Sequence, residues 1–339
     1  MSQLAALLPA LRGGFGDFTL SGPRARHGVM ASLAVGAAIV LALALHVQDP
    51  WWAGISAFIC TQATQPQLLQ KAALRIAGTV GGAAFSYALA PWAMQDQAAL
   101  LLLLFVAGMV GTLGALVSRF GYAWQLSGMT IFLVTLGALD EPSQFFSLAV
   151  YRTADIVLGV ATSIAVGWLM ASDDAAVVSA APGWRSVLGE NWHAVLHAAR
   201  AGLAVASVPL VWRYLELPNL NQMAVSIASV MAVPALRGVP ALDQAAIAKR
   251  EWQRVAGCLL GGGAALLLVG SPAAQSFLPW LLAIMVGVFL AIQLQTCRFD
   301  INVVGMQAGI ALLLTAMQGW GPPASLAPAI LRIAGMLGA

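Results

Sequence analysis

Two stretches decide the fold of this chain: KAALRIAGTVGGA at residues 71–83 and KREWQRVAGCLLGGG at residues 249–263. Each opens with basic residues, as Lys71 and Arg75 show in the first, and continues into a run of small apolar residues. A long apolar run with cations at its edge is typical of a helix that enters a membrane from the cytoplasmic side. Because the pattern occurs twice, we expect an internal duplication.

The composition predicts an all-α, polytopic membrane protein. Of the 339 residues, 60% are hydrophobic and 9% are charged, whereas soluble domains carry about 25% charged residues. A chain with this small number of charged side chains cannot cover the surface of a globular protein in water. We therefore expect lipid to surround it. The sequence contains no G-x4-G-K-[ST] loop and no H-E-x2-H or clustered Cys/His set. We therefore expect no ATPase activity, no enzyme, no metal and no cofactor.

Apolar runs predict about 11–12 transmembrane helices. Crossing the hydrocarbon layer takes about 20 mostly apolar residues, and the runs at 51–64 and 254–270 fall at or below that length. The predicted spans lie at 28–46, 51–64, 74–94, 98–118, 121–139, 147–171, 196–215, 219–236, 254–270, 274–296, 299–318 and 324–339.

The distribution of cations predicts the orientation. With the N-terminus inside, thirteen of the sixteen Lys and Arg residues fall at cytoplasmic ends, and the outer loops collect acidic residues and tryptophans. Both termini are therefore expected in the cytoplasm. This arrangement explains the net positive charge by membrane topology, so we expect no nucleic-acid partner.

Further pairs of matching positions extend the duplication along the chain. RHGVMASLAVG at 26–36 aligns with LHAARAGLAVA at 196–206, which pairs His27 with His197, and YRTAD at 151–155 aligns with LRIAG at 331–335. Six helices in each half give both halves one orientation, hence two parallel repeats. The expected organisation is a cytoplasmic N-terminal segment at 1–27 with an interfacial helix, repeats at 28–171 and 196–339, and a linker at 172–195. The last helix, which stops seven residues after Arg332, is expected to be either short or truncated.

These motifs resemble the fusaric acid resistance and aromatic acid exporter (FUSC-like) family over residues 24–339. The resemblance rests on Arg26 and His27, on PWWAGISAF at 50–58, on the K-x3-R-x2-G-T-x2-G-G element from Lys71, and on R-x2-D-x3-G from Arg152. It implies a multi-pass protein of the bacterial inner membrane that exports small aromatic carboxylic acids, driven by the proton gradient. It often implies a periplasmic membrane-fusion adaptor as well. Longer members carry a large cytoplasmic domain where this chain has only the linker.

Arg152 and Asp155 are the sharpest candidates for a transport site. They lie at i and i+3 on one helix face, and ionisable residues inside a membrane usually face the protein interior or a water-filled cavity. Arg152 suits a substrate carboxylate because its planar fork binds carboxylates in bidentate fashion, and Asp155 suits an exchanged proton. Arg332 occupies the position of Arg152 in the second half, where Gly335 replaces the acid. A structural ion pair is the alternative.

The other candidates have two interpretations each. Lys71, Arg75, Lys249 and Arg254 either set topology or form a basic vestibule for anions. Gln125 and Gln222 either line the pathway or bond between helices, and His27 and His197 are either structural or relay protons. Small residues in membrane helices promote close backbone packing. The helix-packing candidates are Gly78, Gly81, Gly257 and Gly261.

Three functions remain open from the sequence. The first is a proton-coupled exporter of small aromatic or organic acids. The second is an organic-anion channel, which needs a basic path but no titrating carboxylate. The third is a membrane subunit that does not transport by itself and assembles with an adaptor. The identity of the acid and the formation of a homo-oligomer also remain open.

Overall fold

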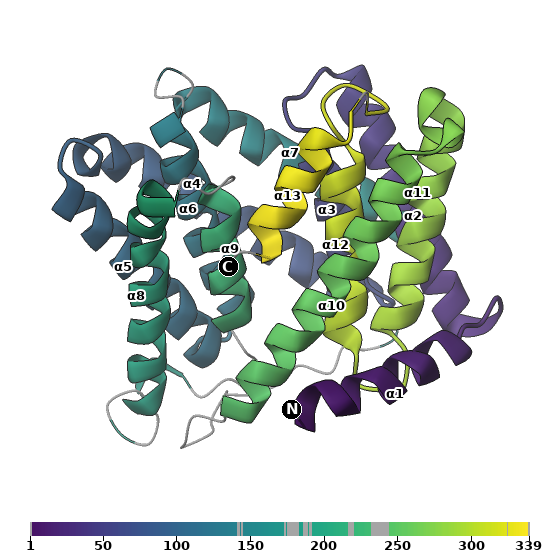
Figure 1. Cartoon of the computed structure of the whole chain (residues 1–339), viewed down its shortest axis with the longest axis horizontal. Helices are drawn as coiled ribbons and strands as arrows, with labels where there is room; N and C mark the ends of the chain where they lie inside the picture. Colours follow the sequence, from purple (N-terminus) through teal and green to yellow (C-terminus); the bar gives the residue numbers. More distant parts are fainter. Residues whose placement is uncertain are drawn as a thin grey trace. The chain divides into compact units, whose positions relative to one another are not determined.

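The computed structural model describes residues 2–140, 143, 145–172, 174, 183–185, 189, 192–215, 220–231, 244–323 and 325–337. All regular elements in these ranges are helical, which confirms the predicted all-α fold (Figure 1). The helices are α1 Ser2–Gly16, α2 Gly22–Ala44, α3 Trp51–Cys60, α4 Gln65–Ala93, α5 Gln97–Val117, α6 Gly121–Asp140, α7 Phe145–Met170, α8 Trp192–Leu215, α9 Leu220–Met231, α10 Gln244–Val269, the 3-10 turn η4 Pro272–Gln275, α11 Phe277–Gln295, α12 Asn302–Ala316 and α13 Ala327–Leu337.

The twelve predicted spans correspond one to one with α2–α13. Within the described residues, seven helices are long and apolar enough to cross a membrane, namely α2, α5, α6, α7, α8, α10 and α11. The apolar helices α3, α12 and α13 have only 10, 15 and 11 residues. The chain is thus a polytopic membrane protein that contains both full-length spans and shorter apolar helices. The predicted linker at 172–195 lies mostly outside the described residues.

The chain forms two compact units, and each unit draws helices from both predicted repeats. One unit comprises residues 1–72, 154–176 and 248–337, and the other comprises 73–153, 177–247 and 338–339. In the first unit α2 makes extensive contacts with α11, and in the second α8 makes extensive contacts with α5 (Figure 1). Both contacts join the first helix of one repeat to the fourth helix of the other. The repeats are therefore units of sequence, while the compact units are mixtures of the two.

Small side chains bring α2 and α11 together in the first unit. Ala31, Ala34, Val35 and Ala38 are fully buried along one face of α2, and Gly36 lies directly against Met285 of α11. Without a hydrophobic driving force between helices in lipid, close van der Waals contact of this kind holds them together.

The second unit has its own core between α5, α6 and α8. It is built from Leu104 of α5, Phe132 and Leu136 of α6, and Val205 and Val208 of α8, all almost completely buried. The start of α5 is fixed by Asp96, whose carboxylate accepts a 2.9 Å hydrogen bond from the N–H of Ala99, as N-cap residues do.

Glycines let the third helix of each predicted repeat approach the fifth. On α4, a Cβ added at Gly82 would lie 2.5 Å from the carbonyl oxygen of Ser127 in α6, and on α10 one added at Gly261 would lie 2.0 Å from that of Ala308 in α12. Gly78 and Gly257 make similar close contacts with the same two helices. The packing role predicted for Gly81 is wrong: a Cβ there meets nothing within 4 Å, and the adjacent Gly82 faces α6 instead.

Candidate functional site

The cations that open α4 and α10 have different surroundings in the two units. Arg75 is 2% exposed and donates a 2.7 Å hydrogen bond to the hydroxyl of Tyr122 in α6. Lys249 instead forms an ion pair with Asp300 at an exposed position. Arg254 is almost as buried as Arg75. The duplicated motif therefore places one buried guanidinium in each unit, and Lys71 and Lys249 lie nearer the surface.

On either side of Arg254 along α10, polar side chains make hydrogen bonds to α12 or to the loop before it. Gln253 donates a 2.7 Å hydrogen bond to the carbonyl oxygen of Asp300. One turn further on, Gln307 of α12 donates its amide N–H to the sulfur of Cys258 at 3.3 Å. These side chains connect the start of α10 to the loop before α12 and to α12 itself.

Arg332 of α13 closes the end of α12. Its Nη1 donates hydrogen bonds to the carbonyl oxygens of Leu314 at 2.6 Å and Met317 at 2.5 Å. Its guanidinium lies 4.1 Å from the ring centroid of Trp51, which is within the range of a cation–π contact. The last carbonyls of a helix lack partners within the helix, so Arg332 satisfies the carbonyl of Leu314 in the last turn of α12 and that of Met317 directly after it.

Arg152 and Asp155 both lie inside α7. Arg152 is 9% exposed and Asp155 is fully buried. Asp155 is also the one acidic residue that is buried among the described side chains. An ionisable pair in such a setting is costly to keep in a membrane helix and is a candidate for function for that reason.

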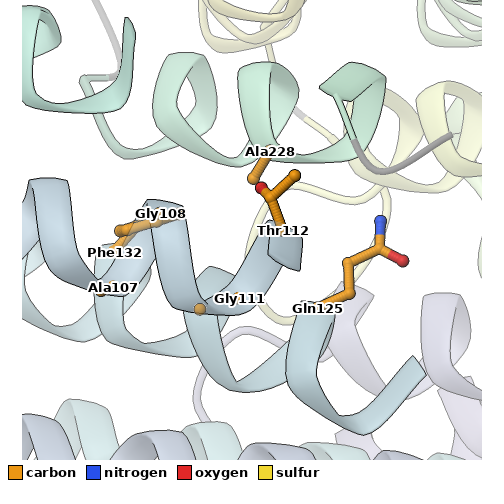
Figure 2. Close-up of a pocket in the computed structure, with 8 residues that line it drawn as sticks. Ala107, Gly108, Gly111, Thr112, Gln125, Phe132 and Ala228 are labelled. Atoms are coloured by element: carbon orange, nitrogen blue, oxygen red, sulfur yellow. The ribbon is translucent and has the colours of Figure 1, made fainter. Parts of the chain in front are cut away.

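Gln125 lines a small pocket between α5, α6 and α9 in the second unit. The pocket is bounded by Thr112, Gln125, Phe132 and Ala228 together with the backbone of Ala107, Gly108, Gly111 and Gly128. Figure 2 shows Thr112 reaching toward Ala228 of α9, with Gln125 extending from α6 nearby. Its centre has room for about one water molecule, so an aromatic acid cannot enter until the helices separate. Gln222 lies in α9, but its side chain is outside the described part of the chain.

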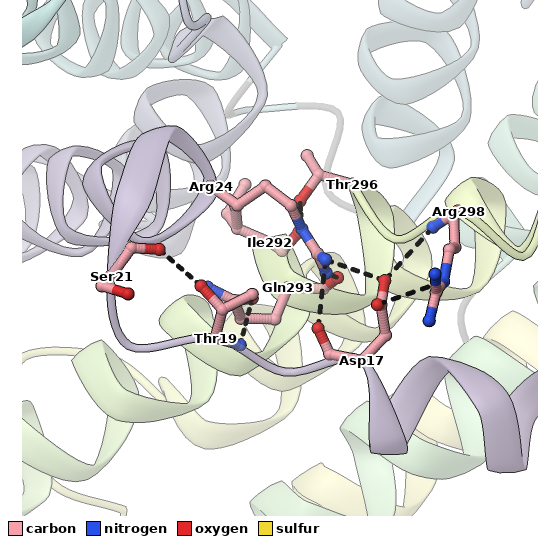
Figure 3. Close-up of polar contacts among 8 residues, drawn as sticks. All are labelled: Asp17, Thr19, Ser21, Arg24, Ile292, Gln293, Thr296 and Arg298. Carbon is pink, nitrogen blue, oxygen red and sulfur yellow. Dashed lines mark hydrogen bonds and ion pairs between the residues drawn. The ribbon is translucent and has the colours of Figure 1, made fainter.

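The N-terminal segment contacts the end of α11 and the loop between α11 and α12. These contacts were not predicted from the sequence. Asp17, just after α1, pairs with Arg24 at 2.8 Å and with Arg298 at 3.3 Å (Figure 3). Arg24 also donates a 2.8 Å hydrogen bond to the carbonyl oxygen of Gln293 near the end of α11. The predicted interfacial helix is thus a 15-residue helix, α1, whose Gly13 and Gly14 lie against Phe299 and Ile301.

Replacing Asp17 by asparagine should loosen these contacts of the N-terminal segment. Asp17 is largely buried, and charge-assisted hydrogen bonds are worth about 1.5–3 kcal/mol. Loss of about 1.4 kcal/mol would raise about tenfold the population in which the N-terminal segment is released from α11 and the loop before α12. Limited trypsin digestion should then cleave after Arg12 about tenfold faster. Asp174→Asn, at an exposed position, should leave the cleavage rate unchanged. Equal rates for the Asp17 variant and the parent chain would contradict this role.

His27 and His197, for which the sequence left a structural and a proton-relay interpretation open, each lie near a backbone carbonyl of a short helical segment. His27 Nε2 lies 3.4 Å from the carbonyl oxygen of Thr61, directly after α3. His197 Nε2 lies 2.8 Å from the carbonyl oxygen of Met231, the last described residue of α9. The alignment of the two histidines was the available signal, since each partner lies 34 residues further along the chain.

This fold defines an all-α polytopic membrane protein. Residues 24–185, just under half of the chain, match the model of the Fusaric acid resistance protein family (FUSC). That stretch contains the whole first predicted repeat, so over this part the chain is similar to the fusaric acid resistance family.

Curated relatives match over the same proportion of the chain. An uncharacterized transporter, YdhK, from Salmonella typhimurium is 26% identical over 159 residues, which is 45% of this chain and 23% of the relative. The p-hydroxybenzoic acid efflux pump subunit AaeB from Edwardsiella tarda is 28% identical over 159 residues, which is 44% of this chain and 24% of the relative. The matched stretch thus spans about a quarter of these relatives. No solved structure matches the chain.

Proposed function

We propose that the protein exports small aromatic or related organic carboxylic acids across the bacterial inner membrane in exchange for protons. The observation that carries this proposal is the charge content of α7, where Asp155 is fully buried and Arg152 nearly so. A relative named as a p-hydroxybenzoic acid efflux pump subunit supports the substrate class.

The chemistry of the two side chains suits antiport. A guanidinium remains charged and presents a planar pair of donors that matches a carboxylate, so Arg152 is the expected receptor for the anion. A carboxyl group shielded from water is stable without charge once it is protonated, so Asp155 is the expected carrier of the exchanged proton. The buried cations Arg75 and Arg254 would attract the anion toward the helices from the cytoplasmic side.

Transport by the purified protein tests the proposal. Labelled 4-hydroxybenzoate is offered to proteoliposomes under pH gradients of either sign with the voltage clamped. We expect accumulation that reverses direction when the pH gradient is reversed. Flux that follows voltage and ignores the pH gradient would instead identify an anion channel.

The name of the AaeB relative, a pump subunit, favours a second candidate. In this case the chain transports only when it is assembled with a periplasmic adaptor. Absence of flux in folded protein, followed by flux when the adaptor is added, would establish the adaptor-dependent subunit.

A further inference from the structure

One face of the N-terminal helix α1 packs against the protein. Leu7 is buried and belongs to an apolar cluster with Ile301 and Val304 at the start of α12. Gly14 lies on the same face of α1, directly against Ile301. These contacts put α1 at the level where α11 ends and α12 begins. Figure 1 shows α1 lying across the ends of these helices rather than alongside them.

A second face of α1 is apolar and exposed in the described part of the chain. Leu8, Arg12 and Phe15 are spaced i, i+4 and i+7, so they form one stripe along the helix. Leu8 is 61% exposed and Phe15 is 49% exposed, and Leu20, in the segment that follows α1, is 92% exposed. Apolar side chains next to a cation on an exposed face are typical of a helix that lies in the membrane interface.

The same end of the protein has an excess of positive charge. Residues 1–27 and 296–301 hold four arginines and two aspartates, and both aspartates already form ion pairs. Two of the arginines, Arg12 and Arg26, are exposed and make no hydrogen bond or ion pair with any residue that the structure describes. The charge therefore favours an anionic partner at this surface.

Arg26 lies at the start of an exposed apolar stripe on α2. Val29, Leu33 and Val40 are 42%, 44% and 43% exposed. They follow Arg26 at i+3, i+7 and i+14, which places all four residues on one face of the helix. Acyl chains that lie along this stripe would bring the phosphate of the same lipid to the level of Arg26, because the headgroup lies where the apolar face begins.

We propose that the N-terminal segment is a binding element for anionic phospholipids. The exposed face of α1 lies in the headgroup layer, and Arg12 and Arg26 each bind a lipid phosphate. Arginine suits this ligand because its planar fork matches the phosphate oxygens, and basic residues at a membrane surface attract anionic lipids. The inference goes beyond the proposed export of acids and does not depend on it.

Photo-crosslinking from α1 identifies what covers its exposed face. The full chain, with p-benzoylphenylalanine in place of Phe15, is reconstituted in phosphatidylcholine that contains a minority of phosphatidylglycerol with the same acyl chains. After irradiation, the adducts are identified by mass spectrometry. We expect phosphatidylglycerol adducts to exceed their share of the bilayer about fivefold, the effect of one basic residue near the surface. Arg12→Gln should reduce them to that share.

Phe277 provides the matched control position. It is 42% exposed and begins α11 at the end away from α1, so the same probe there should form adducts in the proportions of the bilayer. Adducts at position 15 that follow the bulk composition, or that join a second copy of the chain, would overturn the proposal. Enrichment that persists in Arg12→Gln would also contradict it.

A probe in place of Val29 tests the second arginine independently. Phosphatidylglycerol should again be enriched about fivefold, and Arg26→Gln should remove the enrichment at position 29 but not at position 15. Equal enrichment with and without Arg26 would exclude a phosphate at this arginine. None of these measurements uses a transport substrate. A protein that exports no aromatic acid but shows both enrichments would therefore refute the proposed function alone, and a transporting protein without enrichment would refute the lipid site alone.

Discussion

Replacing Gly261 by alanine should lower the melting temperature of the protein, whereas Gly263→Ala should not lower it. The added methyl group at Gly261 would lie 2.0 Å from the carbonyl oxygen of Ala308. Because that atom belongs to the backbone of α12, no side-chain rotation can relieve the contact. Overpacking of this kind costs typically about 1–3 kcal/mol, and we expect the upper end of that range.

Gly263→Ala is the matched control, because Gly263 is also a glycine of α10. A Cβ at Gly263 meets nothing within 4 Å, and alanine is favoured over glycine in a helix by about 1 kcal/mol. The two substitutions should therefore move the melting temperature of the detergent-solubilised protein in opposite directions. Gly82→Ala and Gly81→Ala form the equivalent pair on α4. Similar melting temperatures for Gly261→Ala and Gly263→Ala would show that α10 and α12 do not approach as closely as described.

Replacing Asp155 by asparagine should abolish accumulation driven by the pH gradient. Asparagine has nearly the same shape but cannot carry a proton, so the exchange of an anion for a proton would lose its coupling. We expect gradient-driven accumulation to fall by about two orders of magnitude, the lower end of the roughly 10²–10⁴-fold contribution of a positioned proton-transfer group. Exchange of labelled for unlabelled acid at equal pH should persist, because it needs no net proton movement.

A matched carboxylate controls for the change in charge. Glu251→Gln removes an exposed acid from α10 and should leave both assays unchanged. Arg152→Gln should weaken exchange and accumulation together, since it removes the proposed anion receptor. An Asp155→Asn protein that accumulates acid at the parental rate would exclude Asp155 as the coupling residue.

Helix positions followed closely from hydropathy where the helix is apolar throughout. The span predicted at 98–118 is α5 at Gln97–Val117, because its apolar run and the Asp96 cap define both ends. The span predicted to begin at 254 begins ten residues earlier, at Gln244. The first turns of α10 carry Lys249 and Arg250, and hydropathy does not register a helix that continues outside the lipid.

The sequence alone could not predict which helices pack against each other. Periodicity identifies an apolar face but not the helix that covers it, so the exchange of first and fourth helices between the repeats could not be deduced. The same limit explains the error at Gly81: two adjacent glycines differ by about 100° around a helix, and only the position of α6 selects Gly82. Buried Asp155 and Arg152 were predictable as candidates because charge inside an apolar run is itself the signal.

The exchange of helices bears on how such a chain could arise. Suppose that the two repeats descend from one six-helix ancestor. In each unit the first helix of one repeat packs against the fourth helix of the other repeat. In the ancestor, the first helix of one copy would therefore have packed against the fourth helix of a second copy. The ancestor would have folded as a pair of swapped copies, with a stability that depended on its concentration in the membrane. When the two copies are joined in one chain, their association becomes intramolecular and depends on a fixed effective concentration instead. Gene fusion would then have made the assembly independent of expression level and left each copy free to acquire features, such as Asp155, that the other lacks.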